Sequence, residues 1–298
     1  MNKHYIILGK GYVGNAVNTR FVNEGKSLSF LSRKDVDYTD PLKLSQFIEF
    51  KQQSTTEIPP SSFTIINCAG YTGNPNVDAC ELDYNKPGVY ALNAQLPITL
   101  AQVAMSYNNV DLIHISSGCI YSGYEKIYSE TDVPNFGIYN PNSSFYSKTK
   151  HIAELGLQQF KTGAILRVRM IFGDDESPRN LLNKILKYNN LIALENSMTN
   201  VNDLAAFISS FTDRGLERKH DIYNVVNEGS LSLRVITGIM RKYHKGRSDW
   251  TFTDQVEDLK TKAGRSNCVL DTQKIRSLGL ALPGVTASMD DCIKKIKN

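Results

Sequence analysis

The chain has 298 residues and a net charge of +4, from 34 Lys and Arg against 30 Asp and Glu. Its hydrophobic fraction of 41% is ordinary for a globular protein, and the length allows one large domain or two smaller ones. So mild a charge, without a block of basic residues, gives no support to a nucleic-acid partner. The five cysteines are scattered and odd in number, which argues against a disulfide framework and against a bound metal.

The N-terminal residues lack the long apolar stretch of a signal peptide, and no window is apolar enough to span a membrane. We therefore expect a soluble protein with no membrane partner. Free cysteines are typical of a reducing compartment, so we expect the protein in the cytoplasm.

Short apolar runs alternate with amphipathic segments along the first 170 residues. Strands are expected at 5–8, 27–31, 63–68, 110–116 and 164–170, and helices at 11–24, 87–107, 145–160 and from Pro41 onward, with a polar loop at 52–62. This alternation predicts an α/β fold, a Rossmann-type doubly wound parallel sheet. Ligands then bind at the C-terminal ends of the strands.

The regularity loosens after residue 172. Loops at 173–179 and 191–200 separate shorter helices, and one more strand is expected at 222–226. We therefore expect a Rossmann domain at residues 1–172. A smaller mixed α/β lobe is expected at residues 173–298, with return segments to the main sheet.

A glycine motif follows the first expected strand directly and opens the first helix. It reads Gly9, Lys10, Gly11, Tyr12, Val13 and Gly14. In this context the pattern is typical of dinucleotide binding, because the glycines let the backbone approach a pyrophosphate at the helix N-terminus. The alternative is a tight strand–helix turn that binds nothing.

The second expected strand is followed by Ser32, Arg33 and Lys34. An acidic residue there would bind the ribose hydroxyls of NAD, whereas a cation accommodates the extra phosphate of NADP. The two cations favour NADP as the cofactor. The alternative is a solvated turn.

Tyr146 and Lys150 lie four residues apart on an expected helix, so they share one face. A nearby ammonium stabilises a phenolate, which suits tyrosine to acid–base catalysis. Ser116 and Ser117 end the strand that begins at residue 110, where a hydroxyl can bind a substrate carbonyl beside the tyrosine.

These motifs, with Asn67, Cys68, Ala69 and Gly70 after the third strand, resemble the extended short-chain dehydrogenase/reductases that act on nucleotide sugars. The resemblance implies that Ser117, Tyr146 and Lys150 are catalytic. It also implies that the residues after the third strand bind the cofactor together with Tyr146 and Lys150. In one departure, the glycine motif is a residue shorter than the family's usual spacing.

The resemblance is sharper to the 3,5-epimerase/4-reductases of UDP-4-keto-6-deoxyglucose, found in plants and giant viruses, which complete UDP-L-rhamnose synthesis. It is carried by the segments 70–78, 118–121, 134–136, 145–150, 166–170, 178–180, 196–199 and 265–267. The chain resembles the standalone form, without a dehydratase portion. The expected partner is a UDP-4-keto-6-deoxy sugar, bound by the C-terminal lobe.

Epimerisation beside a ketone needs proton-handling groups beyond the tyrosine that serves the reduction. Cys119 lies two residues after Ser117, at the same strand end. In the family, a cysteine here and a lysine on the helix after Pro-Arg-Asn are the epimerase acid–base groups. They match Cys119 and Lys184, with Lys187 as a competing candidate. The alternatives are a core cysteine and a solvated lysine.

The substrate contacts are expected after the strand ends and in the C-terminal lobe. They are Thr72, Asn74, Asp78, Arg169, Arg179, Asn180 and Arg265. Arginine suits a diphosphate, and Arg265 resembles a family position that closes over the nucleotide. For each of them the alternative is ordinary loop or surface chemistry.

Two other functions remain open at this stage. One is a dTDP-4-dehydrorhamnose reductase that does not epimerise, and the other is a regulatory subunit that keeps the cofactor fold without turnover. A homodimer through the helix of Tyr146 and Lys150 is expected by analogy with relatives.

Overall fold

The computed structural model describes residues 2–53, 60–160, 162–247 and 249–296. Within these ranges one parallel sheet has the strand order β2-β1-β3-β4-β5-β7. Its strands are β1 (Lys3–Leu8), β2 (Leu28–Leu31), β3 (Ser62–Asn67), β4 (Val110–Ser117), β5 (Ala164–Val168) and β7 (Asp221–Asn224). This order reverses direction at β1, so the predicted doubly wound sheet is confirmed.

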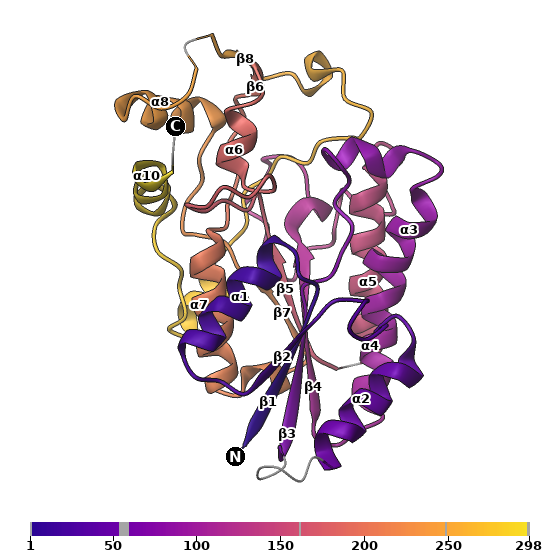
Figure 1. The fold of residues 1–298 in the computed structure, drawn as a ribbon. Coiled ribbons are helices and arrows are strands. Elements are labelled where there is room, and N and C mark those ends of the chain that lie inside the picture. Colours follow the sequence, from indigo (N-terminus) through magenta and orange to yellow (C-terminus); the bar gives the residue numbers. More distant parts are fainter. Residues whose placement is uncertain (1, 54–59, 161, 248, 297–298) are drawn as a thin grey trace.

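Helices cover both faces of the sheet (Figure 1). α1 (Tyr12–Asn23) and α7 (Val201–Asp213) lie on one face, and α2 (Pro41–Gln53), α4 (Leu96–Met105) and α5 (Phe145–Phe160) lie on the other. Strand β1 shows how the two cores arise: Ile7 packs with Val17 of α1, whereas its neighbour Ile6 packs toward Leu44 of α2. A strand buried on both faces explains the continuous apolar runs of the sequence.

The long helix expected at 87–107 is interrupted in the structure. α3 (Lys86–Tyr90) and α4 are joined by a π-helical turn, Ala91–Gln95. Pro97 in the first turn of α4 explains the interruption, because it has no amide N–H to donate to the preceding turn. The turn carries the buried Asn93.

Two of the expected strands have other bounds in the structure. The strand expected at 164–170 ends at Val168, since Met170 has a φ of 37°, in the left-handed region. The strand expected at 222–226 is β7, and its pairing with β5 returns the chain to the main sheet. The domain boundary at residue 172 stays a prediction. Most of the loop expected at 52–62 lies outside the described residues.

A separate group of elements lies beyond the C-terminal ends of the strands, at the top of Figure 1. It comprises α6 (Leu181–Ile185), β6 (Asn190–Ile192), α8 (Leu233–Lys242), β8 (Thr251–Thr253) and α10 (Val285–Lys295), while α9 (Gln273–Ser277) contacts β7. The group has its own core, with Phe172, Trp250 and Met289 buried. No helix of the described residues has the length and apolarity needed to cross a bilayer.

Candidate active site and cofactor edge

The glycine motif is a tightly packed turn between β1 and α1. Gly9 has a φ of 96°, and a Cβ there would lie 2.7 Å from the Cα of Ala69. A Cβ on Gly14 would lie 1.9 Å from the carbonyl oxygen of Gly9, so both positions require glycine. Gly11 instead faces open space and caps α1 without a side-chain acceptor. The amide groups that begin α1 are therefore left for an anion.

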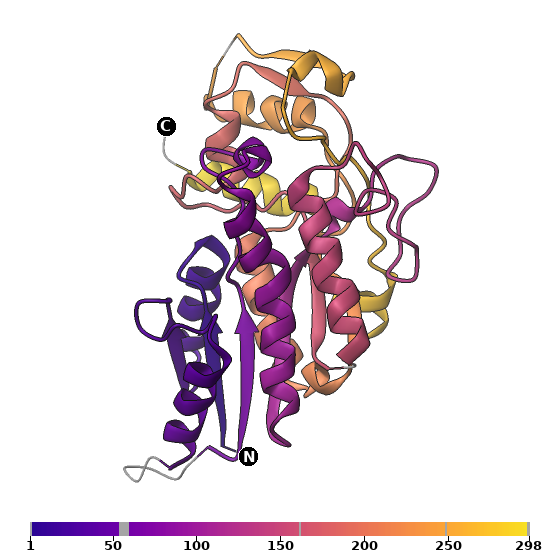
Figure 2. The ribbon, with the colours of Figure 1, turned by 90° about the vertical axis from the view of Figure 1, so that its right-hand side faces the viewer.

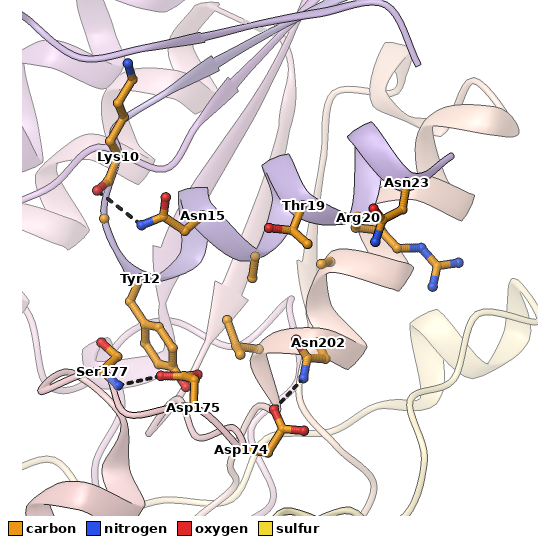
Figure 3. Close-up of a pocket in the computed structure, with 14 residues that line it drawn as sticks. Lys10, Tyr12, Asn15, Thr19, Arg20, Asn23, Asp174, Asp175, Ser177 and Asn202 are labelled. Carbon is orange, nitrogen blue, oxygen red and sulfur yellow. Dashed lines mark hydrogen bonds between the residues drawn. The ribbon is translucent and has the colours of Figure 1, made fainter. Parts of the chain in front are cut away.

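The side chains of Tyr12 and Val13, two of the three non-glycine residues of this motif, point in different directions. Val13 packs against the core beneath the sheet. The ring of Tyr12 points toward Asp175, into a groove of about 700 Å³ between α1, α7 and residues 174–177 (Figure 3). Lys10 and Gly11 line the same groove, and a part for Tyr12 in cofactor binding stays a prediction. None of the expected catalytic side chains lines this groove.

Arg33 and Lys34 are both exposed where β2 ends. The carboxylate that follows, Asp35, accepts hydrogen bonds from the amide and hydroxyl of Ser32, each at 2.7 Å, and pairs with Lys10 at 2.9 Å. The Lys10 ammonium and the Ser32 donors hold the pKa of Asp35 below its usual range. The carboxylate of Asp35 is thus bonded within the turn. The side chains of Arg33 and Lys34 are exposed to solvent at the end of β2.

The catalytic residues expected from the resemblance come together where β4 meets α5. Ser117 ends β4, and its hydroxyl, which accepts from the amide of Cys119 at 3.2 Å, influences the pKa of the Tyr146 hydroxyl. Lys150 is 5% exposed and donates to the carbonyl oxygen of Ile115 on β4 at 3.0 Å. Burial raises the pKa of Tyr146 and lowers that of Lys150 to about 8. The phenol is therefore protonated near neutral pH.

The loop Cys68–Gly70, expected to bind the cofactor, forms the floor beside this group. The amide of Ala69 donates to Asn67 at 3.1 Å, and a Cβ on Gly70 would lie 3.8 Å from the Lys150 nitrogen. Asn93, which the sequence reasoning missed, accepts from the amide of Tyr71 at 2.7 Å and donates to its carbonyl at 2.8 Å. Asn93 thus ties the π-helical turn to this loop.

A second cavity, of about 590 Å³, lies between this edge of the sheet and the C-terminal group of elements. Cys119, Tyr146 and Lys184 all line it, from the 3-10 turn Gly118–Ile120, α5 and α6 respectively. Lys187 is exposed and is not among the lining residues. The structure therefore favours Lys184 over Lys187 as the lysine that faces a substrate.

Lys184 is half-buried, and burial together with the Arg179 guanidinium lowers its pKa. A lowered pKa leaves more of the amine neutral and able to accept a proton. Across the cavity, the Arg169 guanidinium lies 4.0 Å from the Cys119 sulfur. Each of the two expected epimerase groups therefore has an arginine beside it.

Of the expected substrate contacts, Thr72, Asp78, Arg179 and Arg265 line the cavity. Asp78 and Arg265 pair with each other at 3.0 Å, and Asp78 also accepts from the amide of Ala263 at 2.9 Å. This pair joins the 3-10 helix Val77–Glu81 to the C-terminal group of elements. Asn74 is exposed and does not line the cavity.

Two expected substrate contacts do not fit their places in the structure. Asn180 is fully buried, where its side chain caps α6 and bridges the backbone of Gly173. Arg169 is 2% exposed, and its guanidinium bonds Ser266 and the carbonyl of Gly118 rather than facing the cavity. The polar groups of both side chains bond inside the protein, and their contact with a substrate stays a prediction that this placement does not favour.

The cavity also has an apolar side that the sequence reasoning did not identify. Its residues include Tyr188, Leu191, Ile192, Leu233 and Leu259. They come from α8, β6, the 3-10 helix Val256–Leu259 and the loop before β6, segments in which the sequence analysis named no site residue. Within the described residues, no three His, Cys, Asp or Glu side chains are grouped so that they could hold a metal ion.

A parallel Rossmann sheet carries Tyr146 and Lys150 on one helix and Ser117 at the adjacent strand end, which is the arrangement that the sequence resemblance implies. Residues 3–298 match the family model described as the RmlD substrate binding domain, so the chain belongs to this family.

Similarity to curated proteins narrows the resemblance. The chain is 34% identical over 220 residues to an Arabidopsis thaliana trifunctional UDP-glucose 4,6-dehydratase/UDP-4-keto-6-deoxy-D-glucose 3,5-epimerase/UDP-4-keto-L-rhamnose-reductase, a match of 71% of this chain and 31% of that protein. The chain thus spans about a third of the length of this relative. A bifunctional dTDP-4-dehydrorhamnose 3,5-epimerase/reductase of the same plant is 34% identical, over 72% of this chain and 70% of its own.

Solved structures agree with the fold. The UDP-rhamnose synthase of Acanthamoeba polyphaga mimivirus has a TM-score of 0.84 and 25% identity, over 98% of this chain and 99% of its own. A dTDP-4-dehydrorhamnose reductase of Bacillus anthracis, solved in complex with NADP, has a TM-score of 0.78 and 21% identity over 99% of both chains. The resemblance stated from the sequence is therefore confirmed.

Proposed function

We propose that this protein is an NADPH-dependent 3,5-epimerase and 4-keto reductase that converts UDP-4-keto-6-deoxy-D-glucose to UDP-L-rhamnose. The observation that carries the proposal is the shared cavity of Cys119, Tyr146 and Lys184, which offers three proton-handling groups to one ligand. The activities of the plant and viral relatives support the choice of sugar and nucleotide.

The cofactor proposal rests on the fit of the glycine turn and of the β2 end. Gly11 leaves open space before the uncapped amides of α1, which suits a pyrophosphate. Arg33 and Lys34 suit the additional phosphate of NADP, and Asp35 is already bonded to Ser32 and Lys10. NADPH, when bound, supplies the hydride of the reduction.

For the reduction, Tyr146 donates the proton that the ketone oxygen gains. Its raised pKa keeps the phenol protonated. The Lys150 ammonium stabilises the phenolate that remains after the transfer. The substrate carbonyl gains one hydride and one proton, so the step is balanced.

For the epimerisation, Cys119 and Lys184 handle the protons at the carbons beside the ketone. One group removes a proton from one face of the sugar ring and the other returns a proton to the opposite face. The lowered pKa of Lys184 suits it to accept a proton. Ser117 and Tyr146 are placed to hydrogen-bond the enolate oxygen that forms in between.

The test is incubation of the protein with NADPH and UDP-4-keto-6-deoxy-D-glucose in deuterium oxide. We expect UDP-L-rhamnose labelled at carbons 3 and 5, with one NADPH oxidised for each product. If only preformed 4-keto-rhamnose is reduced, without ring labelling, the protein is a reductase alone. If no 4-keto sugar nucleotide supports NADPH oxidation, the regulatory-subunit alternative replaces the proposal.

A homodimer through α5 and a cytoplasmic location remain proposals of the same kind. They rest on the behaviour expected of relatives and on the free cysteines. Light scattering of the purified protein tests the dimer.

A further inference from the structure

Beneath the catalytic group lies a buried ion pair to which the proposed mechanism assigns no role. Glu154 and Arg167 are each 1% exposed, on α5 and β5. Arg167 donates to Glu154 from Nε, at 3.1 Å to one oxygen, and from Nη2 at 2.7 Å. The Ser116 hydroxyl adds a hydrogen bond of 2.5 Å to the other oxygen. The carboxylate is thus held from two strands.

An ion pair is an unfavourable filling for the space between α5 and the sheet, because both charges lose their hydration there. Removing two charges from water costs several kcal/mol per ion, and apolar residues of similar volume often stabilise a protein as well or better. Arg167 is further held by the hydroxyl of Tyr121, to which its Nη1 donates at 2.9 Å. So complete a set of partners indicates that the position of the Glu154 charge matters.

The register of α5 shows what that charge faces. Tyr146, Lys150 and Glu154 recur every four residues, so they lie on one face of the helix. Lys150 and Glu154 bond consecutive residues of β4, namely the Ile115 carbonyl and the Ser116 hydroxyl. The carboxylate therefore lies one helical turn beyond the ammonium, on the side away from Tyr146.

Several other titratable groups surround Lys150. Tyr146 lies one turn away on the same helix, and the groups that interact with Lys150 are His114 on β4, Cys119 in the 3-10 turn and Cys68 after β3. Burial keeps the pKa of His114 well below its usual value, so it adds no positive charge at neutral pH. Glu154 is the carboxylate of this set, and it is the largest influence that opposes the effect of burial on Lys150.

We propose that Glu154 is a positioning residue for the reduction: its charge, fixed by Arg167 and Ser116, holds Lys150 in the cationic form beside Tyr146. Arg167 orients both carboxylate oxygens, so that the negative charge cannot turn away from the helix face. The inference rests on the proposed reductase function and adds a residue that touches neither substrate nor cofactor.

The sign of the effect follows from the charge of the lysine. Burial alone favours the neutral amine, and the Lys150 pKa of about 8 reflects burial only partly offset by Glu154. Loss of the carboxylate lowers that pKa further. The alkaline limb of the activity profile, where Lys150 loses its proton, should then move to lower pH.

The test compares kcat/KM for NADPH-dependent reduction across pH in the wild type, Glu154→Gln and Glu154→Asp. In Glu154→Gln we expect the alkaline limb to move down by about one pH unit, a roughly tenfold change in proton affinity. Activity below the limb should change little. Glu154→Asp keeps the charge and should keep the limb near its wild-type place. A structural role alone would lower activity at every pH and leave the limb unmoved.

Glu154→Gln leaves Arg167 buried without its partner, so the variant can fail to fold. The double variant Glu154→Gln/Arg167→Met removes both charges, and its limb should move in the same direction by a smaller amount. An unmoved limb in the folded single variant, or in the double variant where the single one does not fold, overturns the proposal.

NADPH binding, followed by cofactor fluorescence in the same buffers, separates this inference from the proposed function. It needs no sugar, and we expect its alkaline limb to move with that of the reduction. If the wild type reduces no 4-keto sugar nucleotide, the proposed function fails. In that case the movement of the binding limb in Glu154→Gln still supports the role of Glu154, and an unmoved binding limb refutes it.

Discussion

The residues proposed for reduction and those proposed for epimerisation are held in different ways. Tyr146 and Lys150 lie on α5, a helix of four turns packed against β4, and Lys150 is bonded to the strand itself. Cys119 lies in a three-residue turn and Lys184 in a five-residue helix of the C-terminal group of elements. The first pair is fixed by the sheet, and the second lies on both sides of the cavity.

The difference teaches how one cavity can carry two chemistries. Hydride transfer needs one fixed alignment of ketone, tyrosine and cofactor, which a rigid helix beside a strand end provides. Proton exchange at two ring carbons needs groups on opposite faces of the sugar. The edge of the sheet can place such a group on one face of the sugar only. A second group of elements on the other side of the cavity can place one on the opposite face.

The largest expected effect comes from removing the hydroxyl of Tyr146. Tyr146→Phe should lower kcat for NADPH oxidation by about 10³-fold, since a positioned general acid contributes about 10²–10⁴-fold. Tyr188→Phe is the matched control, because Tyr188 lines the same cavity. Spectrophotometry of NADPH with UDP-4-keto-L-rhamnose measures both. A similar loss in the two variants would contradict the distinct role of Tyr146.

The next effect separates the two chemistries. Cys119→Ala and Lys184→Ala should each lower deuterium incorporation at the sugar ring by about 10²-fold or more, from the loss of a proton-handling group. Reduction of UDP-4-keto-L-rhamnose should stay within a few-fold of wild type.

Lys187→Ala is the matched control for the lysine. Lys187 lies one helical turn from Lys184 but is exposed outside the cavity, so its loss should leave ring labelling unchanged. Mass spectrometry of the product measures the label. Normal labelling in Lys184→Ala, with labelling lost in Lys187→Ala, would reverse the assignment that the cavity favours.

The long helix that carries Tyr146 and Lys150 could be predicted from the sequence, whereas the short elements around the cavity could not. α5 was expected at 145–160 and occupies Phe145–Phe160, because a long amphipathic helix between two strands has a clear period. The short strands β6 and β8 escaped prediction, since three residues show no alternation. The π-helical turn escaped as well, because Pro97 within the segment signals a break in the helix but not the kind of turn that replaces it.

For the candidate site, the sequence predicts where residues lie along strands and helices but not which way each side chain points. Spacing placed Tyr146 and Lys150 on one helix face and Ser117 at a strand end, and the family resemblance joined the three residues into one site. It could not show whether a side chain after a strand points outward. Arg169 and Asn180 follow expected elements but turn inward to bond the backbone.

A smaller effect is expected at the cofactor edge. Arg33→Ala should raise KM for NADPH by about 10- to 100-fold and leave KM for NADH unchanged, since a charge-assisted hydrogen bond contributes about 1.5–3 kcal/mol. Lys34→Ala tests the second cation, and Lys43→Ala, an exposed lysine on α2, is the control. Steady-state kinetics with both cofactors measures the ratio. A wild-type preference for NADH would refute the NADP assignment itself.

The smallest effect is expected where the two sides of the cavity meet. Asp78→Asn removes the ion pair with Arg265 but keeps an oxygen that can accept from the amide of Ala263. Both side chains of the pair are about a quarter exposed, so the pair should contribute no more than about 1 kcal/mol.

We therefore expect Asp78→Asn to raise KM for the sugar nucleotide by about three- to fivefold, with kcat nearly unchanged. The reason is that the pair closes the cavity without touching the reacting atoms. Asp83→Asn is the matched control, because Asp83 forms an exposed pair with Lys86 outside the cavity. A fall in kcat for Asp78→Asn as large as that of Tyr146→Phe would show that the carboxylate acts on the chemistry, and the division between fixed catalytic groups and a closing side would fail.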